Sequence, residues 1–276
     1  MSDNTLVSLS DSLAAAVSAA APSLVRVQSG RRVASGLVWG DGLVVTVARA
    51  VSRRHTPSVV LHDGSAHDAE IVGRDPSLDL ALLRVPVAEL TVPTRSVHAP
   101  KVGHIVLALG RPGAGPRASM GLISAVAGPW TTPDGGRLDA FWDVDGALPP
   151  GFSGGPLLDA RGGVLGLNTS GLVRGGATIP AATIDRSVEA LQQHGDRSPG
   201  FLGVLFQPAK LSDEQAALAG HAGALLITGL KPRGPASQAG LRVGDLLLAV
   251  DEQPIAGWDD LAQALAGKAG HPGSAR

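Results

Sequence analysis

The strongest chemical signal in the sequence is a serine enclosed by glycines, in the segment 151–157 (Gly-Phe-Ser-Gly-Gly-Pro-Leu). A serine nucleophile needs an exposed hydroxyl and nearby backbone N–H groups that stabilise a developing oxyanion. Glycines permit the backbone conformation that provides both. Ser153 is therefore the candidate nucleophile. A glycine-rich turn with an incidental serine is the alternative interpretation of this segment when it is taken alone.

The same segment also fits G-x-S-x-G, the strand–serine–helix turn of another large class of hydrolases. That turn requires a helix directly after the serine. Here the serine is followed by Gly-Pro, an apolar pair, a turn over 159–163 and the apolar run 164–168, which is typical of a strand. The predicted order of elements excludes this second type of serine site.

Two segments upstream of the serine are placed to complete a catalytic group. Asp79 precedes the apolar run 80–83, where a carboxylate can be buried and can orient an imidazole. An aspartate before a strand is also a common turn residue. The segment 42–51 (Gly-Leu-Val-Val-Thr-Val-Ala-Arg-Ala-Val) lies where the base belongs in the chain order base, carboxylate, serine.

In order and spacing, the three segments resemble the HtrA (Deg) family of trypsin-fold serine proteases. That family has G-x-V-V-T-N-x-H-V, then D-x-x-x-D-L-A-x-L, then G-N-S-G-G-P-L, and the resemblance extends over nearly the whole chain. It implies that Ser153 is the nucleophile, Asp79 the orienting carboxylate, and the N–H groups of Gly151 and Ser153 the oxyanion hole. It also implies a substrate pocket with walls at Leu167, Asn168, Thr169, Ser170 and Ala177.

The chain departs from the family pattern at Arg49, which falls on the position of the catalytic histidine. A guanidinium group keeps its proton at any working pH, so it cannot accept the proton of Ser153. Arg49 is expected to pair with Asp79 and to fill the space of the imidazole. A single base change converts a histidine codon into an arginine codon, so a sequence variant or a sequencing error is an alternative origin of Arg49.

A substitute base would need to lie within hydrogen-bonding reach of the serine hydroxyl. No lysine lies near a motif, and His55 lies six positions after Arg49 in a predicted loop. The other histidines of this half of the chain have no motif support. These are His62, His67, His98 and His104.

The leading hypothesis is an HtrA-like pseudoprotease that binds unfolded proteins or peptide C-termini and is catalytically impaired at Arg49. The alternative is an active serine endopeptidase of protein quality control that uses Ser153 with an unrecognised base. A third hypothesis is a binding scaffold within a homotrimer, which is an assembly that the family resemblance implies.

The elements that must position these residues are short apolar runs separated by turn residues, which predict a mostly β fold. Two such groups, about 24–97 and 100–183, have no helices between their strands and predict two closed barrels. With the resemblance, this is a trypsin-like double six-stranded β-barrel. A helix over about 184–194 completes a predicted serine protease domain of residues 1–195.

From residue 196 the pattern changes to short helices between strands, which predicts a small α+β domain over 196–276. This part resembles a PDZ domain, a module that captures peptide termini by strand addition. The run 258–266 would be its groove-lining helix. The chain stops at Arg276, before the closing strands of such a domain, so a C-terminally truncated PDZ domain is expected. The residues that match its carboxylate-binding loop are Phe201, Leu202, Gly203 and Val204.

Composition excludes several classes of function. The formal net charge is −1 with both signs interspersed, so no nucleic-acid partner is expected. The chain has no cysteine and its histidines are scattered, so no metal site and no cofactor are expected. The segment 1–30 lacks a basic start and an unbroken apolar run, which predicts an amphipathic helix, no membrane span and a cytoplasmic protein. A periplasmic location is the alternative if a leader has been removed.

Overall fold

The computed structural model describes residues 4–132, 134–173, 175–196, 204–230, 235–258, 260–261 and 264. Its contacts divide the chain into two compact units. The first comprises Met1–Thr132 and Arg137–Arg197, and the second comprises Pro133–Gly136 and Ser198–Arg276.

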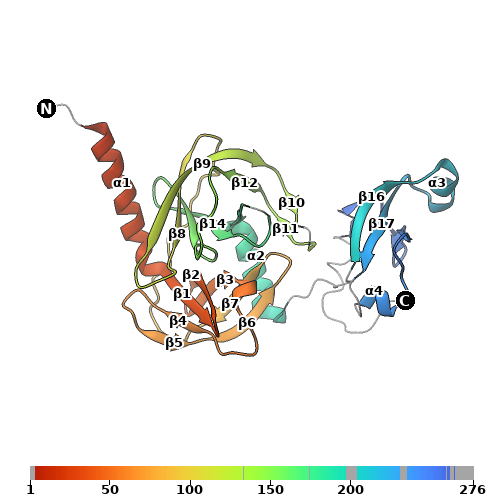
Figure 1. Ribbon diagram of the computed structural model, residues 1–276. Coiled ribbons are helices and arrows are strands. Elements are labelled where there is room, and N and C mark those ends of the chain that lie inside the picture. The colour runs from red at the N-terminus through yellow and green to blue at the C-terminus, as the bar shows by residue number, and fades with distance from the viewer. Residues whose placement is uncertain are drawn as a thin grey trace. The chain divides into compact units, whose positions relative to one another are not determined.

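The first unit begins with helix α1 (Thr5–Ala20) and a short turn, η1 (Ala21–Ser23), followed by an antiparallel sheet (Figure 1). The sheet has seven strands in the order β5-β4-β1-β2-β3-β7-β6. This is one strand more than the six expected, because the segment around residue 63 folds into a short hairpin at the sheet edge. The strands are β1 (Leu24–Ser29), β2 (Arg32–Gly40), β3 (Leu43–Val47), β4 (Ser58–Val60), β5 (Ala66–Asp68), β6 (Glu70–Asp75) and β7 (Leu80–Arg84).

The second sheet of this unit has six strands in the order β12-β9-β8-β13-β14-β15. Helix α2 (Ala181–His194) follows its last strand directly and begins three residues earlier than predicted. In the chain between β9 and β12, β10 (Trp130–Thr131) and β11 (Arg137–Leu138) form a separate hairpin. The strands of the sheet are β8 (Ile105–Gly110), β9 (Arg117–Ala127), β12 (Phe141–Val144), β13 (Pro156–Asp159), β14 (Val164–Thr169) and β15 (Ala177–Pro180).

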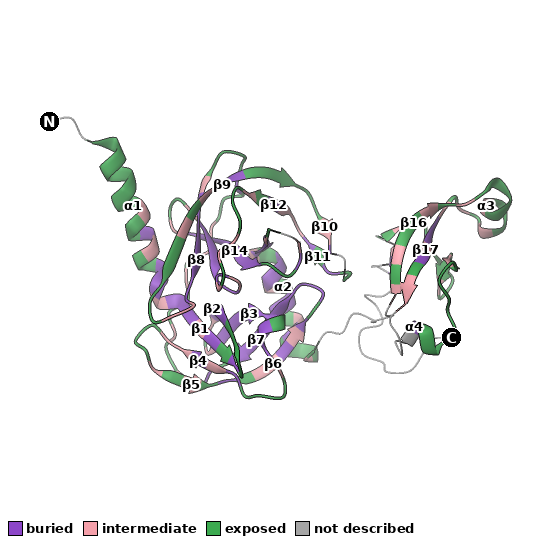
Figure 2. Cartoon of the chain, in the orientation of Figure 1, coloured by how far each residue is buried: buried purple, intermediate pink, exposed green. Residues whose placement is uncertain are grey.

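The main hydrophobic core lies where the two sheets and α2 meet. Fully buried side chains such as Leu37 from β2, Leu158 from β13 and Leu191 from α2 belong to one cluster, which appears purple in Figure 2. Each such side chain contributes on the order of 1.5–3 kcal/mol on leaving water. Strands β3 and β14 are buried along their whole length, as their nearly continuous apolar sequences require. This shared core holds the facing ends of the two sheets in place.

Helix α1 packs only its last turns against this core, through Leu13, Ala16, Val17 and Ala20. The earlier Leu6 is 76% exposed. The 19 residues Thr5–Ser23 are nevertheless long and apolar enough to cross a membrane. Alanines rather than an unbroken run of large apolar residues make this segment apolar, and its length was not predicted; length and composition alone do not overturn the prediction of no membrane span. A core helix or an N-terminal signal sequence meets the same criterion.

The second unit contains a three-stranded antiparallel sheet in the order β16-β17-β18 and a two-stranded ribbon, β19-β20. A small core joins the sheet to the segment around Leu261, with Leu225 and Ile255 fully buried. The described elements of this unit are β16 (Val204–Lys210), α3 (Asp213–Ala219), β17 (Gly223–Leu230), α4 (Pro235–Gln238), β18 (Leu246–Leu247), β19 (Ala249–Val250) and β20 (Gln253–Pro254). The predicted mostly β fold is confirmed.

Candidate active site

Ser153 lies in the tight turn before β13, between the two sheets. The N–H of Ser35 in β2 donates to the Ser153 carbonyl over 3.0 Å, and the N–H of Gly154 donates to the Asn168 carbonyl in β14 over 2.8 Å. Gly154 has a φ of +88°, and a Cβ at this position would overlap the Ser35 carbonyl oxygen. Only glycine allows both sheets to hold the serine turn this closely.

Phe152 anchors the same turn in the second sheet. It is 4% exposed and packs in a cluster with Trp142 and Leu157. Gly110 at the end of β8 makes room for it, because a Cβ there would lie 2.8 Å from the Phe152 ring. The residue that stands where the family pattern has asparagine is therefore a core side chain of this protein.

Asp79 precedes β7 and has a φ of +52°, a conformation that aspartate tolerates better than most residues. Its side chain is 8% exposed. Oδ1 accepts the backbone N–H of Arg49 over 3.1 Å, and Oδ2 accepts the hydroxyl of Thr169 over 2.5 Å. The Asp79 carbonyl also accepts the N–H of Ala48 over 3.0 Å. These contacts tie the carboxylate to the end of β3 and to β14.

Arg49 lies in the short helical turn η2 (Ala48–Ala50) after β3. Its Nη1 forms an ion pair with Asp79 and donates to the Thr169 hydroxyl over 2.8 Å. Its Nη2 donates to Ser153 Oγ over 2.7 Å and to Ser170 Oγ over 2.9 Å. A Cβ at Gly171 would overlap Arg49 Nη1. The guanidinium group thus bridges the carboxylate and the serine, and the expected ion pair with Asp79 is present.

The groups around the serine hydroxyl are mostly hydrogen-bond donors. Besides Arg49 Nη2, the N–H of Ser170 donates to Ser153 Oγ over 3.3 Å, and Ser170 Oγ lies 3.2 Å away. Within the described part of the chain, no imidazole or carboxylate is hydrogen-bonded to Ser153 Oγ. His55 instead lies against Gly30. The surroundings of the hydroxyl stabilise negative charge on the oxygen but do not remove its proton.

A polar network behind the serine turn was not predicted from the sequence. Ser35 Oγ donates to the Gly151 carbonyl over 2.7 Å and accepts the backbone N–H of Arg111 over 2.7 Å. The Arg111 side chain is buried and donates to the carbonyls of Leu24 and Ala114. Burial lowers the pKa of Arg111 below its ordinary value, and the nearby charge of Arg26 lowers it further. A polar residue inside the apolar strand β2 was the available signal for this network.

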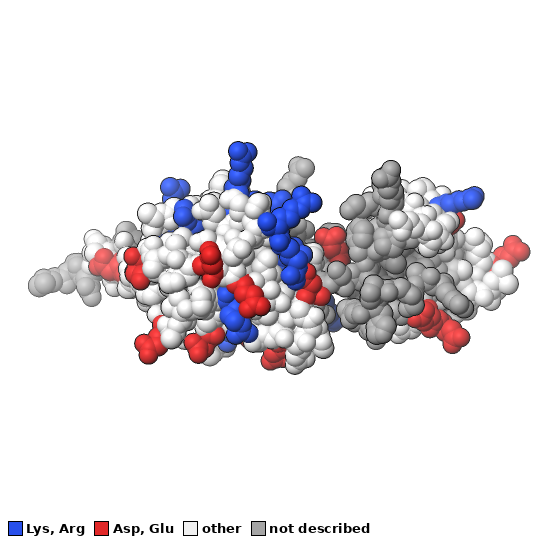
Figure 3. Space-filling model, turned by 90° about the horizontal axis from the view of Figure 1, so that it is seen from below, with Lys and Arg blue, Asp and Glu red and all other residues white. Residues whose placement is uncertain are grey.

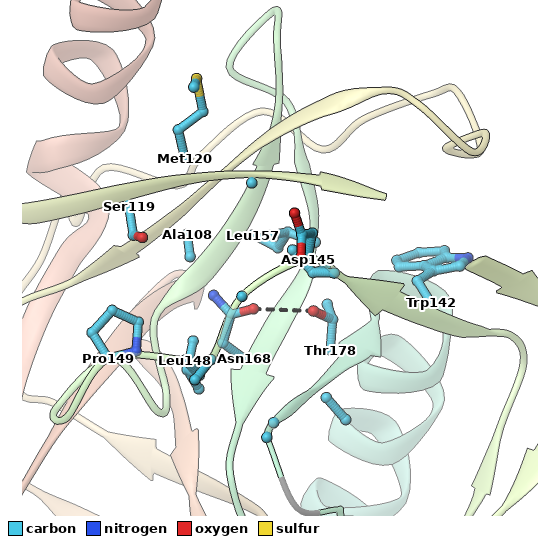
Figure 4. A pocket seen from close by; sticks show the side chains of 17 residues that line it. Ala108, Ser119, Met120, Trp142, Asp145, Leu148, Pro149, Leu157, Asn168 and Thr178 are labelled. Carbon is cyan, nitrogen blue, oxygen red and sulfur yellow. Dashed lines mark hydrogen bonds between the residues drawn. The ribbon is translucent and has the colours of Figure 1, made fainter. Parts of the chain in front are cut away.

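A pocket opens beside the site and is lined by strands of the second sheet (Figure 4). Of the predicted wall residues, Asn168 and Ala177 line it, and the Asn168 side-chain oxygen accepts the hydroxyl of Thr178 over 3.0 Å. Leu167 is fully buried in the core and Thr169 contacts Asp79, because side chains alternate across β14. Ser170 faces Arg49. The pocket's other labelled lining residues are Ala108, Ser119, Met120, Trp142, Asp145, Leu148, Pro149 and Leu157.

In the second unit, the predicted carboxylate-binding loop falls mainly on Phe201, Leu202 and Gly203, which lie outside the described residues. Val204 is described as the first residue of β16 and pairs with Leu230 of β17. Of the predicted groove-lining helix over 258–266, residues 258, 260, 261 and 264 are described. The Trp258 ring packs edge-on against Phe206 with centroids 6.0 Å apart, and Leu261 and Ala264 are buried in the small core.

Comparisons with known proteins agree with this architecture. The profile of the trypsin-like peptidase domain matches residues 34–167, which contain Arg49, Asp79 and Ser153. The profile of the PDZ domain matches residues 226–272. The predicted combination of a trypsin-like domain and a PDZ domain is therefore confirmed.

Among curated proteins, the chain is 35% identical over 257 residues to a probable periplasmic serine endoprotease DegP-like from Bartonella henselae, covering 88% of this chain and 50% of that protein. The corresponding protein of Pseudomonas putida strain F1 is 35% identical over 252 residues, covering 88% and 52%. The chain thus spans about half the length of the curated relatives it matches.

Solved structures of similar proteins also match, and the match covers a larger share of each solved chain than of the curated proteins. A structure of a serine-to-alanine variant of the HtrA-type protease AlgW with a tripeptide has a TM-score of 0.66 and 30% identity, covering 92% of this chain and 88% of that one. A serine endoprotease from Yersinia pestis has a TM-score of 0.64 and 28% identity, covering 91% and 86%. This chain belongs to the HtrA family of trypsin-like serine proteases.

Proposed function

We propose that this HtrA-family protein binds polypeptide segments at the Ser153 site and hydrolyses them very slowly or not at all. Arg49 stands where the family has its general-base histidine, and the residue roles follow from that position. Ser153 is the nucleophile, Asp79 the carboxylate, and the N–H groups of Gly151 and Ser153 the oxyanion hole. The observation that carries the proposal is the 2.7 Å hydrogen bond that Arg49 Nη2 donates to Ser153 Oγ.

The chemical reason is the direction of that hydrogen bond. Acyl transfer to a serine requires a group that accepts the hydroxyl proton as the oxygen attacks the carbonyl carbon, and that later returns the proton to the leaving amine. Arg49 has only donors and can do neither. Removing the base from a comparable triad costs on the order of 10⁶ in turnover. Binding does not need the base and is retained in this proposal.

The peptide-binding part of the proposal is supported by the pocket and by the second domain. The pocket is lined largely by small or apolar groups such as Ala177 and Leu148, which favours an aliphatic side chain of the bound segment. The matched PDZ profile supports capture of peptide C-termini as a second mode of binding. We assign residues 1–195 to the protease-like domain and 196–276 to the PDZ domain. Unfolded proteins are the partners that this combination fits.

We further propose a periplasmic location rather than a cytoplasmic one. The matched curated proteins are named as periplasmic, and the apolar helix Thr5–Ser23 suits an export signal or an anchor. An alkaline phosphatase fusion to residues 1–30, expressed in a bacterium, tests this, because the reporter becomes active only after export. A homotrimer, as implied by the family, is tested by light scattering of the purified chain.

Cleavage of unfolded casein tests the central proposal. The parent protein, Ser153→Ala and Arg49→His are compared at equal concentration, and products are followed by gel electrophoresis and mass spectrometry. We expect the parent to match Ser153→Ala within error. Arg49→His should gain cleavage, because Asp79 and Ser153 are already placed on either side of residue 49. Parent cleavage that is lost in Ser153→Ala would contradict impairment and establish the active endopeptidase with an unrecognised base.

A further inference from the structure

The surface next to the serine carries an excess of positive charge that the catalytic arrangement does not use. Four exposed arginines lie there, in the turn between β1 and β2, at the start of β2 and on the loop after η2. We call this surface the basic rim. It consists of Arg31, Arg32, Arg53 and Arg54.

Several contacts show that these two segments lie against each other and against the site. The N–H of Ser52 donates to Ser29 Oγ over 3.2 Å, and a Cβ at Gly30 would lie 2.9 Å from the His55 ring. Arg32 Nη1 donates to the backbone carbonyl of Arg49 over 2.6 Å. Since the Arg49 side chain contacts Ser153, the rim is connected to the serine through Arg49.

The charges of the rim are only partly neutralised. Asp196 pairs with Arg53 over 2.8 Å and also with Arg74 over 3.1 Å, so one carboxylate is shared by two guanidinium groups. Within the described residues, Arg31, Arg32 and Arg54 form no ion pair. This local excess contrasts with the formal net charge of −1 for the whole chain. Figure 3 shows one face of the molecule, on which both basic (blue) and acidic (red) side chains occur.

The rim and the pocket belong to opposite sheets, with Ser153 between them. The pocket is lined by the second sheet and its loops, whereas the rim lies on the first sheet. The serine turn is held from both, by Ser35 and by the Asn168 carbonyl. A polypeptide with one side chain in the pocket and its backbone across Ser153 would pass from the second sheet toward the first, which carries the rim.

We propose that the basic rim binds acidic side chains of the polypeptide held at Ser153, so that the site prefers segments in which Asp or Glu lies next to an aliphatic residue. This inference rests on the proposed peptide-binding function and names its substrate class. Arginine suits the role, because its planar group can bind a carboxylate through two parallel hydrogen bonds. Because the rim is exposed to solvent, the preference must weaken as salt increases.

The test measures the affinity of the full chain for three dye-labelled peptides by fluorescence anisotropy. One has acidic residues before a central valine and one has them after it, and the third has Asn and Gln at all of these positions. All three carry an acetylated N-terminus and an amidated C-terminus, which removes the terminal carboxylate that a PDZ domain captures. We expect one acidic peptide to bind about fivefold to tenfold more tightly than the amide peptide at low salt, with the advantage lost at about 0.5 M salt.

Two double variants locate the effect. Arg31→Gln with Arg54→Gln should remove most of the acidic advantage while leaving the amide peptide's affinity unchanged. Arg117→Gln with Arg161→Gln removes two exposed arginines of the second sheet region and should leave the advantage intact. Circular dichroism confirms that both variants are folded.

The outcomes separate the two proposals. Equal affinity for all three peptides, or an advantage that survives in the rim variant, overturns the basic rim and leaves peptide binding standing. Failure of all three peptides to bind overturns both the rim and the proposed peptide-binding function at Ser153.

Discussion

The Nη2 atom of Arg49 lies 2.7 Å from Ser153 Oγ and donates a hydrogen bond to it. The proposed nucleophile, Ser153, therefore faces a permanent cation whose other side is paired with Asp79. The arrangement retains the geometry of a carboxylate, a central side chain and a serine in a row. In the proposed function, Arg49 occupies the place of the side chain that would have to exchange a proton with the serine.

Asp79→Asn tests whether the carboxylate is a structural partner of Arg49. Asparagine tolerates the positive φ of +52° but removes the charge that neutralises the guanidinium group. We expect the free energy of unfolding to fall by about 1–3 kcal/mol, measured by urea titration. Asp79→Ala should lose roughly a further 1–2 kcal/mol, because alanine does not favour this backbone conformation. An Asp79→Asn protein as stable as the parent would contradict the role of the ion pair.

Gly154→Ala tests the closeness of the serine turn to β2. The added Cβ would overlap the Ser35 carbonyl oxygen, so the turn must move away from the first sheet. Gly103→Ala is the matched control, because Gly103 has a φ of +89° with no atom within 4 Å of an added Cβ. Both variants carry the backbone cost of roughly 1–2 kcal/mol. Thermal unfolding should show a clearly larger loss for Gly154→Ala, and equal losses would refute the close packing.

Ser35→Ala removes the hydroxyl that joins the Gly151 carbonyl to the N–H of Arg111. Because both partners lose a hydrogen bond at a buried position, unfolding should become easier by about 1–3 kcal/mol. Ser23→Ala serves as the comparison. Ser23 is also fully buried, and its hydroxyl has no hydrogen-bond partner among the described residues, so its loss should be neutral or stabilising. The opposite order of stability, from urea titration, would contradict the network.

The free energy of unfolding should decrease in acid, because protonation of Asp196 weakens its ion pairs with Arg53 and Arg74. Partial burial raises the pKa of Asp196, but hydrogen bonds from Arg53 and Arg74 outweigh this and leave the pKa below its ordinary value. A carboxyl with a lowered pKa in the folded state contributes stability above its unfolded pKa of about 3.9, and the contribution is lost as the pH falls through the folded value. Parent and Asp196→Asn should therefore differ by about 0.2–1 kcal/mol at pH 6 and converge near pH 2. A difference that persists in acid would exclude this cause.

Local patterns were sufficient to predict the strands and the serine turn. The group of strands predicted over about 24–97 appears as β1 to β7, and the apolar run after Asp79 appears as β7. The ion pair between Arg49 and Asp79 was expected from the family order of motifs and is present. Each of these features depends on a short stretch of sequence or on motifs in a fixed order.

No short sequence pattern indicated the contacts that hold the serine turn. Ser35 and Gly151 are 116 positions apart, and Arg111 meets the Leu24 carbonyl across 87 positions. Such bonds depend on how the two sheets face each other, which periodicity does not specify. The assignment of Leu167 to the pocket wall failed for a related reason, because the face of β14 that points to the pocket is set by pairing with its neighbours. The length of the apolar segment Thr5–Ser23 was not predicted, because alanines and serines separate its large apolar residues.

The rate at which Ser153 reacts with a fluorophosphonate, followed by intact-mass spectrometry, tests the account most directly. Such a reagent modifies a serine only when its hydroxyl is activated, and it requires no substrate to be identified. We predict that the parent reacts at least about 1,000-fold more slowly than Arg49→His, and that Ser153→Ala gains no mass. A parent protein that is modified at Ser153 as fast as Arg49→His would contradict the claim that Arg49 leaves the serine without a base.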